Sequence, residues 1–114
     1  MVTRHVHLEI LTRLLALDRP IAELAEMARL LPWDSEVELA EVGREALVSI
    51  LTRYRRGEIS ARDVEAWANL VEGREDLAFT RESAAIVHHL ANPILDGALT
   101  EDSAAQLIER ATAD

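Results

Sequence analysis

Apolar residues recur three and four positions apart along most of the chain, which is the spacing of one face of an α-helix. Residues 5–17 are the clearest case, because they carry one broad stripe of six apolar residues: Leu8, Leu11 and Leu15, with Ile10, Leu14 and Leu17 beside them. Such a wide stripe is typical of a helix that packs on more than one neighbour. No stretch alternates apolar and polar residues as a half-buried strand does. The sequence therefore predicts an all-α fold class, a single domain over residues 1–114 with five or six helices around one core.

Capping and helix-breaking residues divide this pattern into separate helices. Helix N-termini favour Ser, Thr and Asp, and helix C-termini favour Gly or a following Pro. The predicted starts are at Asp18, Ser35, Ser60, Thr80 and Thr100, and the predicted ends are at Leu17, Leu31, Arg56, Gly73 and Ala91. Ser35 with Glu38, and Ser60 with Asp63, match the capping box. Gly43 lies inside the third predicted helix, where it either admits a close neighbour or marks a start later than Ser35.

The fourth predicted helix separates an apolar face from a polar one. The residues at helical spacing that we expect to face the core are Val64, Trp67, Ala68 and Val71. The residues then left on the outer side are Arg62, Glu65, Asn69, Glu72 and Asp76. This acidic stripe is either a solvated face with local ion pairs from Arg62 and Arg74, or a docking surface for a basic protein. Arg74 can also bond Asp76 or the carbonyls at the end of the helix.

Charge is unevenly distributed and limits the partners that the chain can attract. The 114 residues hold 12 Arg, no Lys and 21 acidic side chains, which gives a formal net charge of −9. Residues 58–114 carry most of it, with 4 Arg against 12 acidic residues. A negative surface repels nucleic-acid phosphates and attracts a basic protein, so we expect no nucleic-acid partner. The simpler explanation of the charge is solubility alone.

Three further observations bear on the kinds of site and on the location of the protein. Without cysteine the chain can hold no disulfide, no thiolate nucleophile and no thiolate metal site. No apolar run approaches the roughly 20 residues of a membrane span. The N-terminus also lacks the pattern of a secretory signal. We therefore expect a soluble, cytoplasmic protein with no membrane partner.

The histidines are the remaining candidate metal ligands. His5 and His7 lie two positions apart, so on a helix they point to different sides, and adjacent His88 and His89 also diverge. His5 and Glu9 lie four positions apart and could share an ion. No His-Glu-x-x-His or paired Glu-x-x-His pattern occurs. A small metal or enzyme site would need these two regions of the chain to converge in space, and we expect neither a metal nor another cofactor.

Groups for enzyme chemistry are also sparse. The carboxylates that lie close in sequence are Glu23 and Glu26, Glu41 and Glu45, and Glu72 with Glu75 and Asp76. Such pairs do acid–base work only where a pocket forces their pKa values apart. The chain has no Gly-rich phosphate loop, nucleophile elbow or catalytic triad pattern. We therefore expect a protein that is not an enzyme.

One basic cluster interrupts the acidic sequence. Arg53, Arg55 and Arg56 surround Tyr54 at the end of the third predicted helix. The cluster could touch nucleic acid, but arginines are also favoured at a helix C-terminus, where the helix dipole is negative. The net charge favours this second interpretation.

Several sequence patterns resemble known proteins. Leu51-x-x-Tyr54-x-x-Gly57-Glu58-Ile59-Ser60-Ala61 and Val64-Glu65-x-Trp67-Ala68-Asn69-x-x-Glu72-Gly73-Arg74-Glu75-Asp76, with Leu90-Ala91-Asn92-Pro93 and Leu99-Thr100, resemble a group of small, uncharacterised bacterial all-helical proteins. The resemblance covers roughly residues 47–108. The Gly-Glu-Ile-Ser-Ala turn is also similar, more weakly, to bacterial toxin-immunity proteins of the colicin D immunity type. Those proteins are acidic helical bundles that block a basic toxin nuclease by covering its active site.

The functional hypothesis follows from the stripe, the charge and this resemblance. We expect a non-enzymatic acidic binding protein, in its most concrete form an immunity-like or antitoxin-like inhibitor of a basic toxin. The predicted contact set is Glu65, Asn69, Glu72, Glu75 and Asp76. The alternative is a structural or regulatory subunit that self-associates as a homodimer through the wide apolar stripe of residues 8–17.

Overall fold

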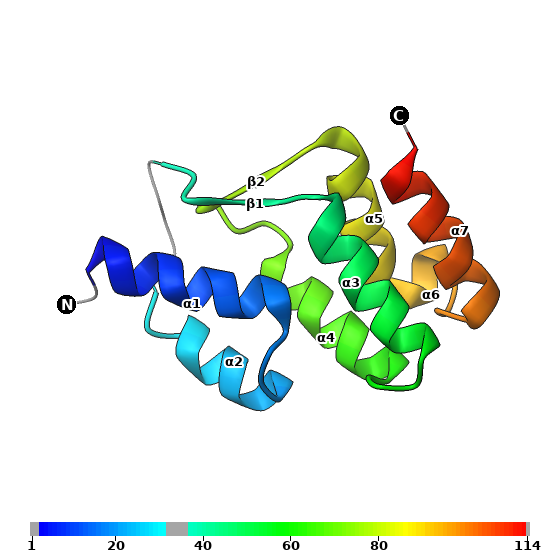
Figure 1. Cartoon of the computed structure of the whole chain (residues 1–114), viewed down its shortest axis with the longest axis horizontal. Helices are drawn as coiled ribbons and strands as arrows, with labels where there is room; N and C mark the ends of the chain where they lie inside the picture. The colour runs from blue at the N-terminus through cyan, green and yellow to red at the C-terminus, as the bar shows by residue number, and fades with distance from the viewer. Residues whose placement is uncertain (1–2, 32–36, 114) are drawn as a thin grey trace.

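The computed structural model describes residues 3–31 and 37–113, which form helices and one small sheet (Figure 1). The elements are α1 (Arg4–Ala16), α2 (Ile21–Ala28), β1 (Ala40–Val42), α3 (Arg44–Arg55), α4 (Ala61–Val71), β2 (Leu77–Phe79), α5 (Arg81–Ala91), α6 (Pro93–Asp96) and α7 (Glu101–Thr112). The predicted helical character is confirmed. The fold is not strictly all-α, however, and the described residues form seven helices rather than five or six. In this part of the chain, no helix has both the length and the apolar character needed to cross a membrane.

Reciprocal capping explains where three of the helices begin. The capping boxes pair Ser60 with Asp63 on α4, Thr80 with Ser83 on α5, and Thr100 with Ser103 on α7. In each pair, each of the two side chains accepts a hydrogen bond from the backbone N–H of the other residue. These three predicted starts are confirmed. The cap at Asp18 is wrong, because α2 begins after Pro20 without a side-chain cap and Asp18 instead approaches Arg13 at 3.4 Å.

The third predicted helix begins later than Ser35. Gly43 is extended, with φ −97° and ψ −177°, and it is the residue from which α3 starts at Arg44. The residues just before it form β1 rather than helix. Of the two explanations for Gly43, the later start is therefore confirmed. Ser35 itself lies outside the described residues. The helix predicted to start there, with a capping box to Glu38, is nevertheless wrong, because residues 37–39 are not helical and residues 40–42 form β1.

A two-stranded parallel sheet joins the two halves of the chain. β1 pairs with β2 in the register Ala40 with Leu77, Glu41 with Ala78, and Val42 with Phe79. The two strands lie side by side above α1 in Figure 1. Each strand has only three residues, which is too short for an alternating pattern to be recognised in the sequence. The predicted absence of strands is therefore wrong, in addition to the helix count.

Trp67 lies at the centre of the core, as predicted. Its side chain is fully buried, and its indole Nε1 donates a hydrogen bond of 2.8 Å to the carbonyl of Leu14. The other three residues predicted on this face, Val64, Ala68 and Val71, are also buried. α4 is thereby fixed against α1, with one face turned inward along its whole length.

The wide apolar stripe of α1 is covered within the chain. Leu11 and Leu14 are fully buried, and α1 contacts α2, α3, α4 and β1. Leu8 remains 41% exposed, which leaves little of the stripe for a second copy. α1 ends at Leu17, a buried residue in the left-handed conformation with φ 47°.

Candidate functional site

The orientation of α4 decides which acidic residues reach the surface. Because Trp67 points into the core, Asn69 and Glu72 are exposed on the opposite side, and Glu65 is half-buried. Glu75 is exposed in the turn after the helix. Asp76 is only 2% exposed, so its predicted place on the outer surface is wrong.

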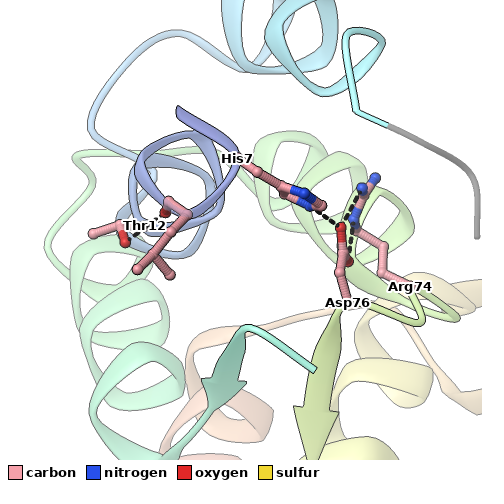
Figure 2. A network of polar contacts seen from close by, with 5 residues as sticks. His7, Thr12, Arg74 and Asp76 are labelled. Carbon is pink, nitrogen blue, oxygen red and sulfur yellow. Dashed lines mark hydrogen bonds and ion pairs between the residues drawn. The ribbon is translucent and has the colours of Figure 1, made fainter. Parts of the chain in front are cut away.

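Asp76 can be buried because the side chains of Arg74 and His7 both hydrogen-bond its carboxylate (Figure 2). Arg74 donates from Nε to Oδ1 at 2.9 Å and from Nη2 to Oδ2 at 2.8 Å. His7 of α1 donates from Nε2 to Oδ2, also at 2.8 Å. An ionised carboxylate can only accept, so Nε2 is the protonated nitrogen of this histidine. Both carboxylate oxygens are therefore used inside the protein.

The electrostatics of this cluster favour the ionised carboxylate. Burial by itself raises the pKa of Asp76, but hydrogen bonds from Arg74 and His7, together with the charges of these side chains, have the larger combined effect. The pKa of Asp76 therefore lies below its usual value of 3.8. A buried carboxylate with a lowered pKa, whose two oxygens are both hydrogen-bonded within the protein, has a structural role.

The backbone of Asp76 extends this structural role to the sheet. Its carbonyl accepts a hydrogen bond of 2.8 Å from the backbone N–H of Leu39, just before β1. One residue thus connects α1, the β1 end of the sheet and the turn after α4. The bond between Arg74 and Asp76 was one of the alternatives that the sequence suggested. His7 could not be predicted as their partner, because it lies 69 residues away and no local pattern links it to the turn.

Two residues of the predicted contact set already have neighbours within the chain. Oε2 of Glu72 lies 2.8 Å from Nδ1 of His88 on α5, and Asn92 bonds the backbone of the same histidine. Nδ2 of Asn69 donates to the carbonyl of Glu65 one helical turn earlier. Both contacts are exposed, and exposed ion pairs contribute little to stability in water.

Asn69 and Glu72 line a groove between α2 and α4. Its volume is about 480 Å³, and its lining is Ala25, Ala28, Arg29, Leu31, Asn69, Leu70, Glu72, Gly73 and Arg74. The alanine and leucine residues form an apolar floor, and the polar residues stand at its rim. The two arginines are already paired, Arg29 with Glu26 at 3.3 Å and Arg74 with Asp76. The structure therefore brings these two predicted contact residues together beside an apolar surface.

Glu65 and Glu75 lie apart from that groove lining. Glu65 borders a different groove of about 270 Å³, between α4 and the segment around α6. Glu75 follows Arg74 in the exposed turn. The predicted set is thus divided along α4 and its following turn rather than gathered in one pocket.

The histidines do not form a metal site in the described residues. No group of three or more His, Asp or Glu side chains with a suitable arrangement occurs in residues 3–31 and 37–113. His5 is exposed, and Glu9 contacts Arg13 at 3.3 Å. His88 is paired with Glu72, far along the chain from both.

The basic cluster has a structural role that differs in detail from the predicted one. Nη1 of Arg53 donates to the carbonyls of Ala16 and Leu17, each at 3.0 Å. The arginine therefore caps the C-terminus of α1 rather than that of its own helix. The hydroxyl of Tyr54 donates to the carbonyl of Leu99 at 3.2 Å. The arginines were predicted at a helix C-terminus, and the terminus that Arg53 caps belongs to a helix 36 residues earlier in the chain, which no local pattern indicates.

Comparison with known proteins finds no relative of this chain. No protein-family model, curated protein or solved structure matches the chain.

Proposed function

We propose that this chain is a non-enzymatic binding protein that seats a basic protein against an acidic edge. The acidic edge consists of Glu65, Asn69, Glu72 and Glu75, which is the predicted contact set without Asp76. The observation that carries the proposal is the burial of Trp67, because it turns Asn69 and Glu72 outward beside the groove between α2 and α4, with Glu65 earlier on the same helix and Glu75 in the turn that follows it. The most concrete version is an immunity-like or antitoxin-like inhibitor that occludes a basic toxin.

The groove supports this proposal by its chemistry. An arginine or lysine side chain has an aliphatic stem and a charged head, so it prefers an apolar surface that ends at a carboxylate. The floor of Ala25, Ala28 and Leu70 offers such a surface, and Glu72 stands at its rim. Since Arg29 and Arg74 are paired with Glu26 and Asp76, they do not oppose an incoming cation at full strength.

Binding of a basic probe tests the proposal directly. The probe is a twelve-residue peptide of alternating Arg and Leu, titrated by calorimetry and followed by amide chemical shifts. We expect the largest shifts on the acidic edge and around the α2 floor. Changing Glu65, Glu72 and Glu75 to Gln should weaken binding by about tenfold, since each lost charge contributes a few tenths of a kcal/mol or more.

A matched variant separates recognition from net charge. Changing Glu101, Asp102 and Glu109 to their amides removes the same charge from exposed positions on α7. We expect this control to bind within about twofold of the original chain, because non-specific attraction is screened over about 10 Å in salt. Equal weakening by both variants, or shifts scattered over the whole surface, would contradict a defined acidic edge.

A genetic selection tests the inhibitor version. Genomic fragments from the source organism that are toxic on expression are screened for rescue by this chain. We expect rescue by the original chain, loss of rescue with the acidic-edge variant, and retained rescue with the α7 control. Rescue that survives loss of the acidic edge would place the inhibitory surface elsewhere.

A further inference from the structure

Two large apolar side chains protrude from α6. Ile94 is 97% exposed and Leu95 is 76% exposed, although both belong to a helix. The helix is a single turn that begins at Pro93 and is ended by Gly97 with φ 103°. None of its residues is buried. Adjacent exposed apolar side chains of this size form a small patch of the kind that marks interaction surfaces.

A groove lies directly beside this patch. Its volume is about 270 Å³, and Pro93 and Gly97, at the two ends of α6, are part of its lining. Val64 of α4 and Leu90 of α5 form its floor, and both are buried. Arg62 stands at its rim. A convex apolar knob and a concave apolar hollow are therefore neighbours on one surface.

We infer that this surface binds a second copy of the same chain through a two-fold axis. A knob and a hollow on the same surface make that surface complementary to itself, because each copy can insert its knob into the hollow of the other. Ile94 and Leu95 of each copy would enter the groove of its partner, against Val64 and Leu90. A different protein could bind by matching only the α6 patch or only the groove, whereas a second copy matches both at once.

The charges beside the patch support a second copy. Arg62 is part of the lining of the groove, and Asp96 is the last residue of α6, next to Gly97 of the same lining. Within the described residues neither side chain has an ion-pair partner. In a two-fold arrangement the arginine of one copy faces the aspartate of the other, and the pair forms twice. This offsets part of the repulsion between two chains of net charge −9.

This inference differs from self-association through α1. The stripe of α1 is buried by other elements of the same chain, whereas the α6 patch has no cover within it. It also goes beyond the proposed function, since α6 and Asp96 are not part of the acidic edge. Only Glu65 borders both surfaces.

Analytical ultracentrifugation of the full chain tests the inference. Across about 5 to 500 μM we expect a monomer–dimer equilibrium, because a small interface gives weak association. Ile94→Asp with Leu95→Asp should raise the dimer dissociation constant at least about tenfold. The control is Leu30→Asp. Leu30 lies two residues beyond the end of α2 and its apolar side chain is 64% exposed, so this change should leave the dimer dissociation constant unchanged. Circular dichroism confirms that each variant is folded.

A charge exchange tests the arrangement itself. Arg62→Asp alone and Asp96→Arg alone should each weaken the dimer, and the double variant should restore it to within about threefold. A chain that stays monomeric at the highest concentration overturns the inference. So does a dimer that is unaffected by the α6 variant, and so does association that grows beyond two copies. Failure of the double variant to restore association overturns the pairing across the axis.

Discussion

At the scale of single residues, Asp76 shows how a charged turn can become part of the core. Its neighbours Arg74 and Glu75 suggest a solvated segment, and the sequence placed Asp76 with the outward residues. The bidentate contact with Arg74 is local, and it was among the predicted alternatives. The burial depends on His7, and a partner 69 residues away leaves no signal in a single sequence. Long-range polar contacts of this kind therefore escape pattern analysis.

The pH dependence of stability should report on this cluster. Because the pKa of Asp76 is lowered in the folded chain, its stabilising effect is fully present above the ordinary value of 3.8 and is lost as the pH falls through the folded value. Asp76→Asn should cost about 2–3 kcal/mol at neutral pH, since it removes the negative charge beside Arg74 and replaces one of the two accepting oxygens by an NH2 group that cannot accept from Arg74 or His7. Urea unfolding from about pH 7 to pH 2.5 measures both effects.

The difference between the two chains should shrink as the pH falls. Glu75→Gln, at the exposed neighbouring position, serves as the control and should follow the original chain at every pH. A loss of stability in Asp76→Asn that stays constant from neutral to acid pH would show that the carboxylate charge is not what stabilises the cluster.

At the scale of elements, capping residues and apolar spacing carried most of the prediction. The starts of α4, α5 and α7 were predicted from Ser60, Thr80 and Thr100, because capping is a local interaction between residues three positions apart. The strands were not predicted, because three-residue strands are held by pairing between distant segments. For the start of α3 the sequence offered both Ser35 and a later start at Gly43, and the later one is correct. The face of α4 was predicted from its sequence, and with it the positions of Glu72 and Asn69.

The two faces of α4 should respond differently to substitution. Trp67→Ala should cost about 3–5 kcal/mol, because it removes a fully buried indole and its hydrogen bond to Leu14. Glu72→Ala should cost less than about 0.5 kcal/mol, because the side chain is exposed and its contact with His88 is weak in water. Denaturant unfolding of the two variants makes the comparison. Similar losses in both would mean that the inner and outer faces are wrongly assigned.

At the scale of the whole molecule, one core unites segments from both ends of the chain. Buried apolar side chains come from every described element except α6, from Ile10 in α1 to Leu107 in α7. The sheet and the Asp76 cluster add connections between the two halves. The sequence predicted one core from its length and apolar pattern, but it could not show the pairing of distant segments.

Unfolding should therefore be cooperative. We expect far-ultraviolet circular dichroism and tryptophan fluorescence to give the same midpoint in urea, because Trp67 contacts α1 and lies in the shared core. Trp33→Phe restricts the fluorescence to Trp67. Two separated transitions would show that α1 and α2 unfold independently of the remaining helices.

The bend after α1 illustrates how a conformation can be imposed from outside. Leu17 has φ 47°, a left-handed geometry that disfavours a side chain with a β-carbon by roughly 1–2 kcal/mol. Its side chain is nevertheless buried, and its carbonyl is bound by Arg53 from α3. Glycine at position 17 would remove the backbone strain of the left-handed conformation, but it would leave a cavity where the Leu17 side chain is buried. The angle between α1 and α2 therefore depends on Arg53, which is distant in sequence, and on the packing of Leu17. A substitution of Arg53 would change the conformation of this bend although no residue in the bend itself is altered.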